Sequence, residues 1–448
     1  PPFRHYKMDL REICEKTIKD SPCEAEVCAF SSRSFSAEVR SQKIESLNRC
    51  SSAGIALRLI NDKRTGFAYS NTFDTATLIK KASDNLKFSP QDNCFNFSER
   101  SEYRDPPYSP DREIKEASDE EKAGLAMKIE SAAYASDRRV VNTESASYSD
   151  EEITVHIATS RGFSAGYSKS SCGGSMQAIS EENGSMEEGY CLKQYTRFRD
   201  LSPEEIGRKA AENATELLGG RPIPSGTMKA VFSPLVSAQF LAAAVPMFSA
   251  DNVRKGKSLF AGKIGRKCGS QKLSLIENAL LNDGLASRPF DDEGMPSKKL
   301  ELIKKGVLKT FLYDLDSASK EGVVSNSNAC RSSFKLPPSI GTTNFYIEPG
   351  ATAGKDLVSS VEKGLYVTRV MALHSLNPIS GDFSLGAAGI FIENGKKAFP
   401  VRGITIAGNL SELFMSINEV GNDLEFFPET GHCGSPSLLI DKIAVSGE

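Results

Sequence analysis

The sequence predicts an α+β protein, in which an N-terminal mixed α/β region precedes a largely antiparallel, β-rich C-terminal domain. Helix and strand patterns are mixed in the first half of the chain. A stretch rich in glycine and proline follows at residues 219–226, and beyond it strand patterns succeed one another without regular helical crossovers. At 448 residues the chain is long enough for two or three domains. We therefore divide it into an N-terminal region, 1–224, and a C-terminal domain, 225–448.

The N-terminal region is predicted to consist of two segments, 1–88 and 112–220, joined by a linker at 89–111. The linker holds four prolines, no glycine and no hydrophobic periodicity. In the first segment the periodicity predicts helix, strand, hairpin and helix, at residues 8–18, 24–30, 54–60 with 65–69, and 73–82. In the second it predicts a charged helix, two strands, an acidic loop and a helix, at residues 114–134, 152–158, 161–169, 181–189 and 203–218.

The last of these helices has clear end signals. Ser202 can accept a hydrogen bond from an unpaired amide, Pro203 suits the first turn, and Glu205 completes a capping box. In the C-terminal domain, Asn394-Gly395 predicts a type I′ hairpin turn. The strand patterns of this domain lie at residues 228–232, 309–313, 344–347, 366–371, 390–393, 398–406 and 438–445.

Composition points to a cytoplasmic protein. Charged residues make up 25% of the chain and the formal net charge is -3, which argues against a dedicated nucleic-acid binder. No apolar run approaches the roughly 18 residues that span a membrane, and the first residues lack the apolar core of a secretion signal. The ten cysteines are scattered without a C-x-x-C pair, which favours reduced, mostly buried thiols.

No motif in the chain specifies a catalytic site by itself. The four histidines do not form a zinc-binding pair on one helix, and no G-x-S-x-G elbow is present. Six basic residues between Arg254 and Lys267 could contact nucleic acid or an acidic peptide, but a solvated loop is the simpler interpretation because only Phe260 could stack on a base. The run Asp291-Asp292-Glu293 could bind a divalent ion, but an Asp-capped turn is more typical of such a run.

Several strings of residues in the C-terminal domain resemble one protein family. They are Leu285–Gly294, Thr343–Gly350, Gly364–Thr368, Gly381–Gly389, Ile392–Gly395, Thr405–Asn409 and Val420–Asp423. Together they resemble the PmbA/TldD family, whose members are called modulators of DNA gyrase and are regarded as metallopeptidases. The hairpin at residues 54–69 resembles the N-terminal part of the same family, so the resemblance covers nearly the whole chain.

The resemblance also suggests a branch of the family. The TldD branch carries a zinc motif, H-E-x-x-x-H, on a helix and a Cys ligand near its C-terminus, whereas the PmbA branch, also called TldE, lacks the motif. An ungapped alignment places Ala242, Ala243 and Met247 where the motif would stand, and Cys433 near the third ligand. Alanines offer no lone pair and a thioether is a weak zinc ligand, so we expect no catalytic zinc on this chain.

The resemblance implies a non-metal-binding subunit of a cytoplasmic metallopeptidase complex that cleaves small or unfolded peptides. The zinc is expected on a TldD-type partner subunit, self-association remains open, and this chain alone is expected to be inactive. The candidates for peptide contact within the family strings are Thr343, Asn344, Tyr346 and Asp382. The alternatives are a regulatory binding protein without hydrolytic activity, and a stand-alone homodimer with its own serine or cysteine chemistry.

Overall fold

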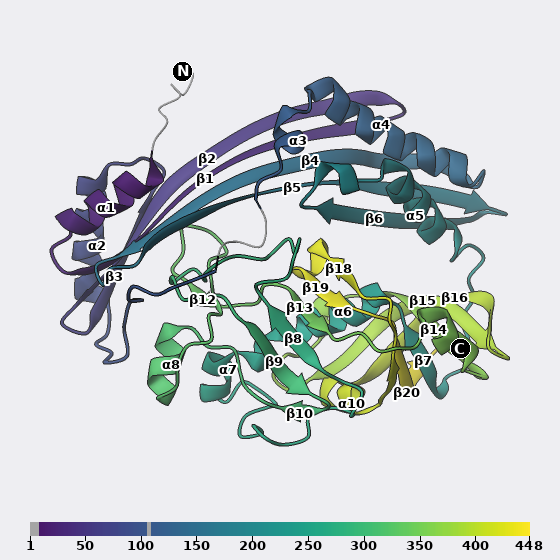
Figure 1. The fold of residues 1–448 in the computed structure, drawn as a ribbon. Helices are drawn as coiled ribbons and strands as arrows, with labels where there is room; N and C mark the ends of the chain where they lie inside the picture. The colour runs from purple at the N-terminus through teal and green to yellow at the C-terminus, as the bar shows by residue number, and fades with distance from the viewer. Residues whose placement is uncertain (1–8, 105–108) are drawn as a thin grey trace.

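In the computed structural model, which describes residues 9–104 and 109–448, a long arched sheet lies over the β-rich C-terminal domain (Figure 1). The sheet order is β3-β2-β1-β4-β5-β6, and all neighbouring strands in it are antiparallel. Its strands are β1 (Glu24–Arg40), β2 (Lys43–Asn61), β3 (Arg64–Ser70), β4 (Val140–Thr159), β5 (Ser164–Glu182) and β6 (Ser185–Tyr195). The strand β6 forms one edge of the arch and the strand β3 forms the other.

Helices pack on the sheet at both ends of the arch (Figure 1). They are α1 (Leu10–Asp20), α2 (Thr75–Asn85), α3 (Arg112–Glu116), α4 (Asp119–Ser136) and α5 (Pro203–Thr215). The apolar residues of α1 and α2 form one core with β1, β2 and β3, and α4 and α5 form further cores with the other strands. A different cluster joins the sheet to the C-terminal domain through Phe163 and Phe290, whose rings meet edge to face at 5.2 Å.

Two sheets form most of the C-terminal domain, and most of their strand pairs are antiparallel. One has the order β16-β15-β14-β7-β20-β17, and an added β16–β20 pairing closes five of these strands into a ring. Its strands are β7 (Gly226–Phe232), β14 (Lys363–Met371), β15 (Asp382–Glu393), β16 (Lys396–Asn409), β17 (Ile417–Val420) and β20 (Leu438–Ser446). The large central core of the domain includes residues of this ring.

The other sheet has the order β10-β9-β8-β13-β19-β18, and a small ribbon, β11–β12, lies beside it. These strands are β8 (Leu275–Asn278), β9 (Lys299–Lys304), β10 (Val307–Leu308), β11 (Ala329–Cys330), β12 (Ser339–Ile340), β13 (Phe345–Ile347), β18 (Glu425–Phe427) and β19 (Cys433–Ser435). The helices of the domain are α6 (Pro234–Ala244), α7 (Ala250–Arg254), α8 (Leu315–Glu321), α9 (Gly354–Ser359) and α10 (Leu410–Met415). Helix α6 packs against β19 as well as β14, so it lies between the two sheets.

The structure confirms the predicted α+β class and several local predictions. Ser202 caps α5 by accepting a hydrogen bond from the Glu205 amide, but in the described structure the Ser202 amide makes no return bond to the Glu205 carboxylate, so only half of the expected capping box forms. Asn394 and Gly395 both have positive φ, as a type I′ turn requires. All ten cysteines are free thiols. No helix in the described ranges has the length and apolar character that crossing a membrane requires.

Four predicted elements differ from the structure. The helix expected at 8–18 begins at Leu10, and residue 8 lies outside the described residues. The helix expected at 114–134 is two helices, because α3 ends at Glu116 with Ala117 as its C-cap, and Ser118 then caps the start of α4. The predicted acidic loop at 181–189 is a hairpin, in which only Asn183 and Gly184 form the turn before β6 begins.

Gly189 suggested a loop because of its type, but the structure gives it a packing role within β6. A Cβ atom there would lie 2.1 Å from the backbone nitrogen of Ala214 in α5, so only glycine allows the helix to approach the strand this closely. The fourth difference is at 309–313, where no strand forms. The Tyr313 amide instead donates a hydrogen bond of 2.8 Å to the Asn326 side chain.

Candidate functional site

The four residues at the expected metal positions lie on and beside helix α6. Ser233 caps this helix by accepting a hydrogen bond from the Val236 amide. Ala242 and Ala243 occupy its last turn and are partly buried against the central core. Met247 follows in a short 3-10 turn and is fully buried. Cys433 is buried on the neighbouring strand β19, and burial raises the pKa of its thiol to about 12.

This set of side chains does not fit a catalytic zinc ion. Two methyl groups provide no ligand atom and the Met247 thioether belongs to the core, so Cys433 alone remains as a ligand of the kind that zinc prefers, whereas a catalytic zinc site needs three protein ligands. In residues 9–104 and 109–448, no group of three or more His, Cys, Asp or Glu side chains has the arrangement of a metal site. The expectation that this chain binds no zinc stays a prediction.

The predicted peptide-contact residues lie in two different places. Thr343 and Asn344 are buried at the start of β13, where the Thr343 amide donates to Glu277 at 2.7 Å. The Asn344 side-chain amide donates to the Asn278 carbonyl at 2.8 Å. Tyr346 is also largely buried, whereas Asp382 is exposed at the start of β15 and accepts a hydrogen bond from the Asn409 side chain. Their contact with a peptide stays a prediction.

Residues of the acidic run and of the basic run make contacts within the chain. Asp291 caps its own turn, because one of its carboxylate oxygens accepts hydrogen bonds from the amides of Glu293 and Met295 at 3.0 and 2.9 Å. The prediction of an Asp-capped turn is therefore confirmed. In the basic run, Arg254 pairs with Asp251 at 2.8 Å. Phe260 is buried, so it is not available to stack on a base.

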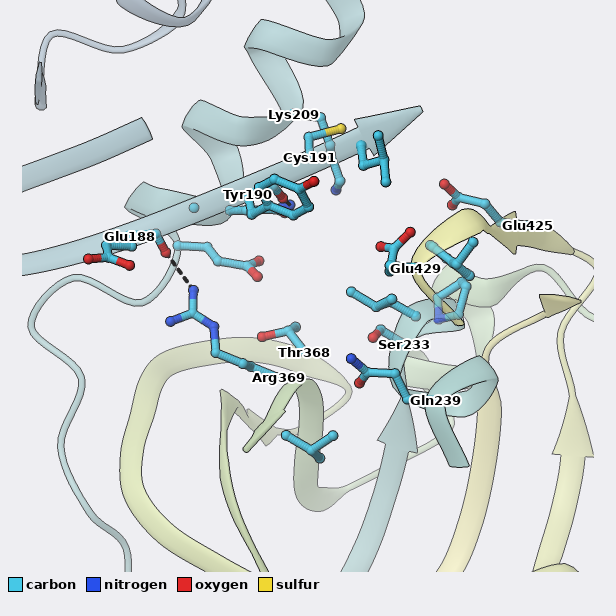
Figure 2. Close-up of a pocket in the computed structure, with 18 of the residues that line it drawn as sticks. Glu188, Tyr190, Cys191, Lys209, Ser233, Gln239, Thr368, Arg369, Glu425 and Glu429 are labelled. Atoms are coloured by element: carbon cyan, nitrogen blue, oxygen red, sulfur yellow. Dashed lines mark hydrogen bonds between the residues drawn. The ribbon is translucent and has the colours of Figure 1, made fainter. Parts of the chain in front are cut away.

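A cavity of about 470 Å³ lies where the edge of the arched sheet meets the C-terminal domain (Figure 2). The edge strand β6 and helix α5 form one wall, and β14, the first half of α6 and the segment from β18 to the following 3-10 turn form the other. Cavities of this size are typical of ligand sites. This cavity is the candidate functional site. The first half of α6 lines it, and Ala242 and Ala243 lie in the last turn of the same helix.

Contacts between the two walls hold the cavity together. The Arg369 guanidinium donates a hydrogen bond of 2.6 Å to the Glu188 carbonyl on β6 (Figure 2). Another nitrogen of the same guanidinium lies 3.5 Å from the Glu187 carboxylate. Lys193 on β6 forms an ion pair with Glu425 on β18. Arg369 and Lys193 therefore already have carboxylate or carbonyl partners. Two further lysines line the cavity: Lys209 lies 3.7 Å from Glu212, and the Lys397 ammonium lies 3.8 Å from the centre of the Tyr366 ring.

The end of the cavity near α6 is rich in hydrogen-bond acceptors. Gln239 lies on α6, Thr368 on β14, and Glu429 in the 3-10 turn Pro428–Thr430. Within the described part of the chain, the Gln239 carbonyl oxygen and the Thr368 hydroxyl are buried and have no hydrogen-bond partner. Glu429 is open to solvent, but the surrounding protein displaces part of its water and thereby raises the pKa of its carboxyl.

Sequence reasoning did not find these cavity residues. The one signal for Gln239 was its polarity within the otherwise mostly apolar helix α6. Ser237 is polar too, but its hydroxyl donates a hydrogen bond to the Phe232 carbonyl within the chain. Glu429 and Thr368 gave no signal, because only the folded chain brings the C-terminal turn and β14 to this helix.

Comparison with known proteins matches three family models along the chain. They are described as PmbA/TldA metallopeptidase domain 1, over residues 25–87; the central domain, over residues 112–218; and the C-terminal domain, over residues 225–447. These ranges together include the strands that carry the arch, helix α6 and the cavity walls.

Individual relatives agree with the family models. The metalloprotease PmbA of Escherichia coli O157:H7 is 28% identical to this chain over 95% of the chain and 92% of its own length. A metalloprotease TldD homologue of Buchnera aphidicola subsp. Acyrthosiphon pisum is 26% identical over 89% of this chain and 88% of its own length. A crystal structure of a candidate modulator of a DNA gyrase from Thermotoga maritima superposes with a TM-score of 0.90, at 29% identity, and covers 98% of this chain and 100% of that chain.

Proposed function

Because the chain belongs to the PmbA/TldD metallopeptidase family, we propose that it is the subunit without a metal site in a cytoplasmic peptidase complex. The complex would pair this chain with a TldD-type subunit, which holds the zinc ion and cleaves small or unfolded peptides. The observation that carries the proposal is the chemistry of α6, where Ala242 and Ala243 offer no ligand and Met247 is part of the core.

The cavity beside α6 supports a role in handling peptide. It lies between the edge strand β6 and the first half of the helix, so a chain segment could lie along it while a partner supplies the reacting groups. Its volume of about 470 Å³ suits the end of an extended chain and excludes a folded domain. This chain would thus bind and orient peptide, and hydrolysis would take place on the partner.

The test is reconstitution with the TldD-type protein of the same organism. The mixture is expected to form a complex on size-exclusion chromatography and to cleave a fluorogenic peptide, whereas each protein alone does not. A partner whose motif glutamate is replaced by glutamine serves as the control, because it should assemble without cleaving. Cleavage by this chain alone, or equal cleavage by the partner alone, would contradict the proposal.

A further inference from the structure

The acceptor-rich end of the cavity lacks matching donors in the described residues. The Gln239 carbonyl oxygen and the Thr368 hydroxyl are buried there without a partner, and unpaired buried polar atoms are destabilising until a ligand pairs with them. The Glu429 carboxylate has no cation within ion-pairing distance among the described side chains, and Lys193, whose charge lowers the pKa of Glu429, is itself paired with Glu425. Figure 2 shows Gln239, Thr368 and Glu429 around the same end of the cavity, next to Ser233.

The arrangement favours one kind of ligand group. A carboxylate or phosphate would be repelled by Glu429, while Arg369 is already engaged by the Glu188 carbonyl and the Glu187 carboxylate. Lys209 and Lys397 also line the cavity, but Lys397 interacts with Glu216 and Lys209, and neither lysine affects the pKa of Glu429. A primary ammonium carries one positive charge and three N–H donors that point in different directions. This matches acceptors that come from three separate elements better than the planar fork of a guanidinium does.

We propose that the end of the cavity formed by Gln239, Thr368 and Glu429 binds the primary ammonium group of a peptide. Glu429 supplies the countercharge, and Gln239 and Thr368 accept the remaining hydrogen bonds. The inference rests on the proposed function, since it names the group by which this subunit holds a peptide. That group is either the peptide's free N-terminus or the end of a lysine side chain.

The experiment measures binding of three peptides of equal length to the full chain by isothermal titration calorimetry. One has a free N-terminus and no lysine, one is N-acetylated without lysine, and one is N-acetylated with a single lysine. We expect the N-acetylated peptide without lysine to bind about tenfold more weakly than one or both of the others, because it loses a charge-assisted hydrogen bond. Which of the two amine-bearing peptides binds tightly identifies the source of the ammonium group.

Variants test whether Glu429 is responsible for the preference for amine-bearing peptides. Glu429→Gln is expected to abolish the preference for the amine, whereas Glu412→Gln, on the exposed surface of α10, is its matched control and should retain it. If Glu429→Gln fails to fold by circular dichroism, Gln239→Met replaces it and should weaken binding of the amine-bearing peptide. Equal binding of all three peptides, no binding of any, or an unchanged preference in Glu429→Gln overturns the inference.

The cleavage assay with the TldD-type partner separates this inference from the proposed function. If Glu429→Gln loses the amine preference but the reconstituted mixture does not cleave peptide, the ammonium site is supported and the peptidase complex is rejected. Cleavage by the mixture without any amine preference would keep the complex and reject the ammonium site.

Discussion

Glu277 on β8 is a buried carboxyl group that the fold retains for its hydrogen bonds. Its carboxylate accepts from both the amide and the hydroxyl of Thr343, while its other oxygen has no partner in the described structure. Burial outweighs these bonds and raises the pKa of Glu277 to about 7. The folded protein therefore binds a proton that the unfolded chain releases at lower pH, since the carboxyl of an exposed Glu titrates near 4.3.

We predict that Glu277→Gln removes this dependence on pH. Because the pKa is higher in the folded state, the contribution of Glu277 to stability is greatest at low pH and falls as the pH rises from about 4.3 to about 7. Relative to the original protein, Glu277→Gln should therefore gain up to about 3 kcal/mol between pH 4 and pH 8. Urea denaturation at both pH values measures the difference, and Glu301→Gln, a control at the surface, should show no comparable gain.

The contacts of a residue could be predicted from the sequence only where the partners lie close by in the chain. The turn at Asp291 could be predicted because its cap involves only the next few residues. Two residues on, Glu293 pairs with Arg58, which is 235 positions away in the chain. No local pattern predicts a partner at that distance, and the same limit hid Gln239, Thr368 and Glu429.

Among helices and strands, the sequence predicted helix starts and hairpin turns better than it predicted the lengths of strands. The Ser202 cap and the Asn394-Gly395 turn depend only on residues close by in the chain, so the sequence predicted the helix start and the hairpin turn correctly, although Glu205 does not complete the expected capping box. The strands β4 and β5 are 20 and 19 residues long, whereas the sequence predicted only residues 152–158 of β4 and, with a start three residues too early, residues 161–169 for β5. Their remaining residues include many serines and glycines, which have little preference for strands. They are extended here because their backbones pair with the neighbouring strands and helices pack on the sheet.

Helix α4 offers a direct test of an end signal. Ser118 accepts a hydrogen bond from the Glu121 amide, and the Glu121 carboxylate accepts one from the Ser118 amide, which completes a capping box. Ser118→Ala should lower the free energy of unfolding by about 1 kcal/mol, because it leaves the first-turn amide without its partner. Thermal and urea unfolding measure the loss.

The control for this test lies on the same helix. Ser131 is exposed on α4, so Ser131→Ala should leave stability unchanged or raise it slightly, since alanine is the better helix former. Equal losses in the two variants would show that the cap contributes nothing.

At the scale of the whole molecule, buried ion pairs join the arched sheet to the C-terminal domain. Arg58 on β2 lies 2.7 Å from Glu26 on β1 and 2.9 Å from Glu293 in the C-terminal domain. Arg331, from the C-terminal domain, also pairs with Glu26. The side chains of Glu26 and Glu293 are only 0% and 2% exposed, so the arginines are their main polar partners. Burial nevertheless raises the pKa of Glu293, and Arg58 only partly offsets this.

Removing the Arg58 side chain should therefore strongly destabilise the folded protein. Arg58→Met leaves two buried carboxylates without one of their cations and should lower the free energy of unfolding by about 3–5 kcal/mol. Arg49→Met removes an exposed arginine that pairs with Asp119, and it should cost less than about 1 kcal/mol. Adding Glu293→Leu to Arg58→Met should recover part of the loss. Similar small losses for Arg58→Met and Arg49→Met would show that the buried pairs do not hold the domains together.

The two proposed subunits differ in metal binding, so the zinc content of each protein distinguishes their roles. Zinc would be measured by inductively coupled plasma mass spectrometry on this chain alone, on the TldD-type partner and on their complex after dialysis. We predict no stoichiometric zinc on this chain, because the α6 positions carry methyl groups and a buried thioether, and stoichiometric zinc in the complex through the partner. Stoichiometric zinc on this chain alone that is lost in Cys433→Ser would contradict the account.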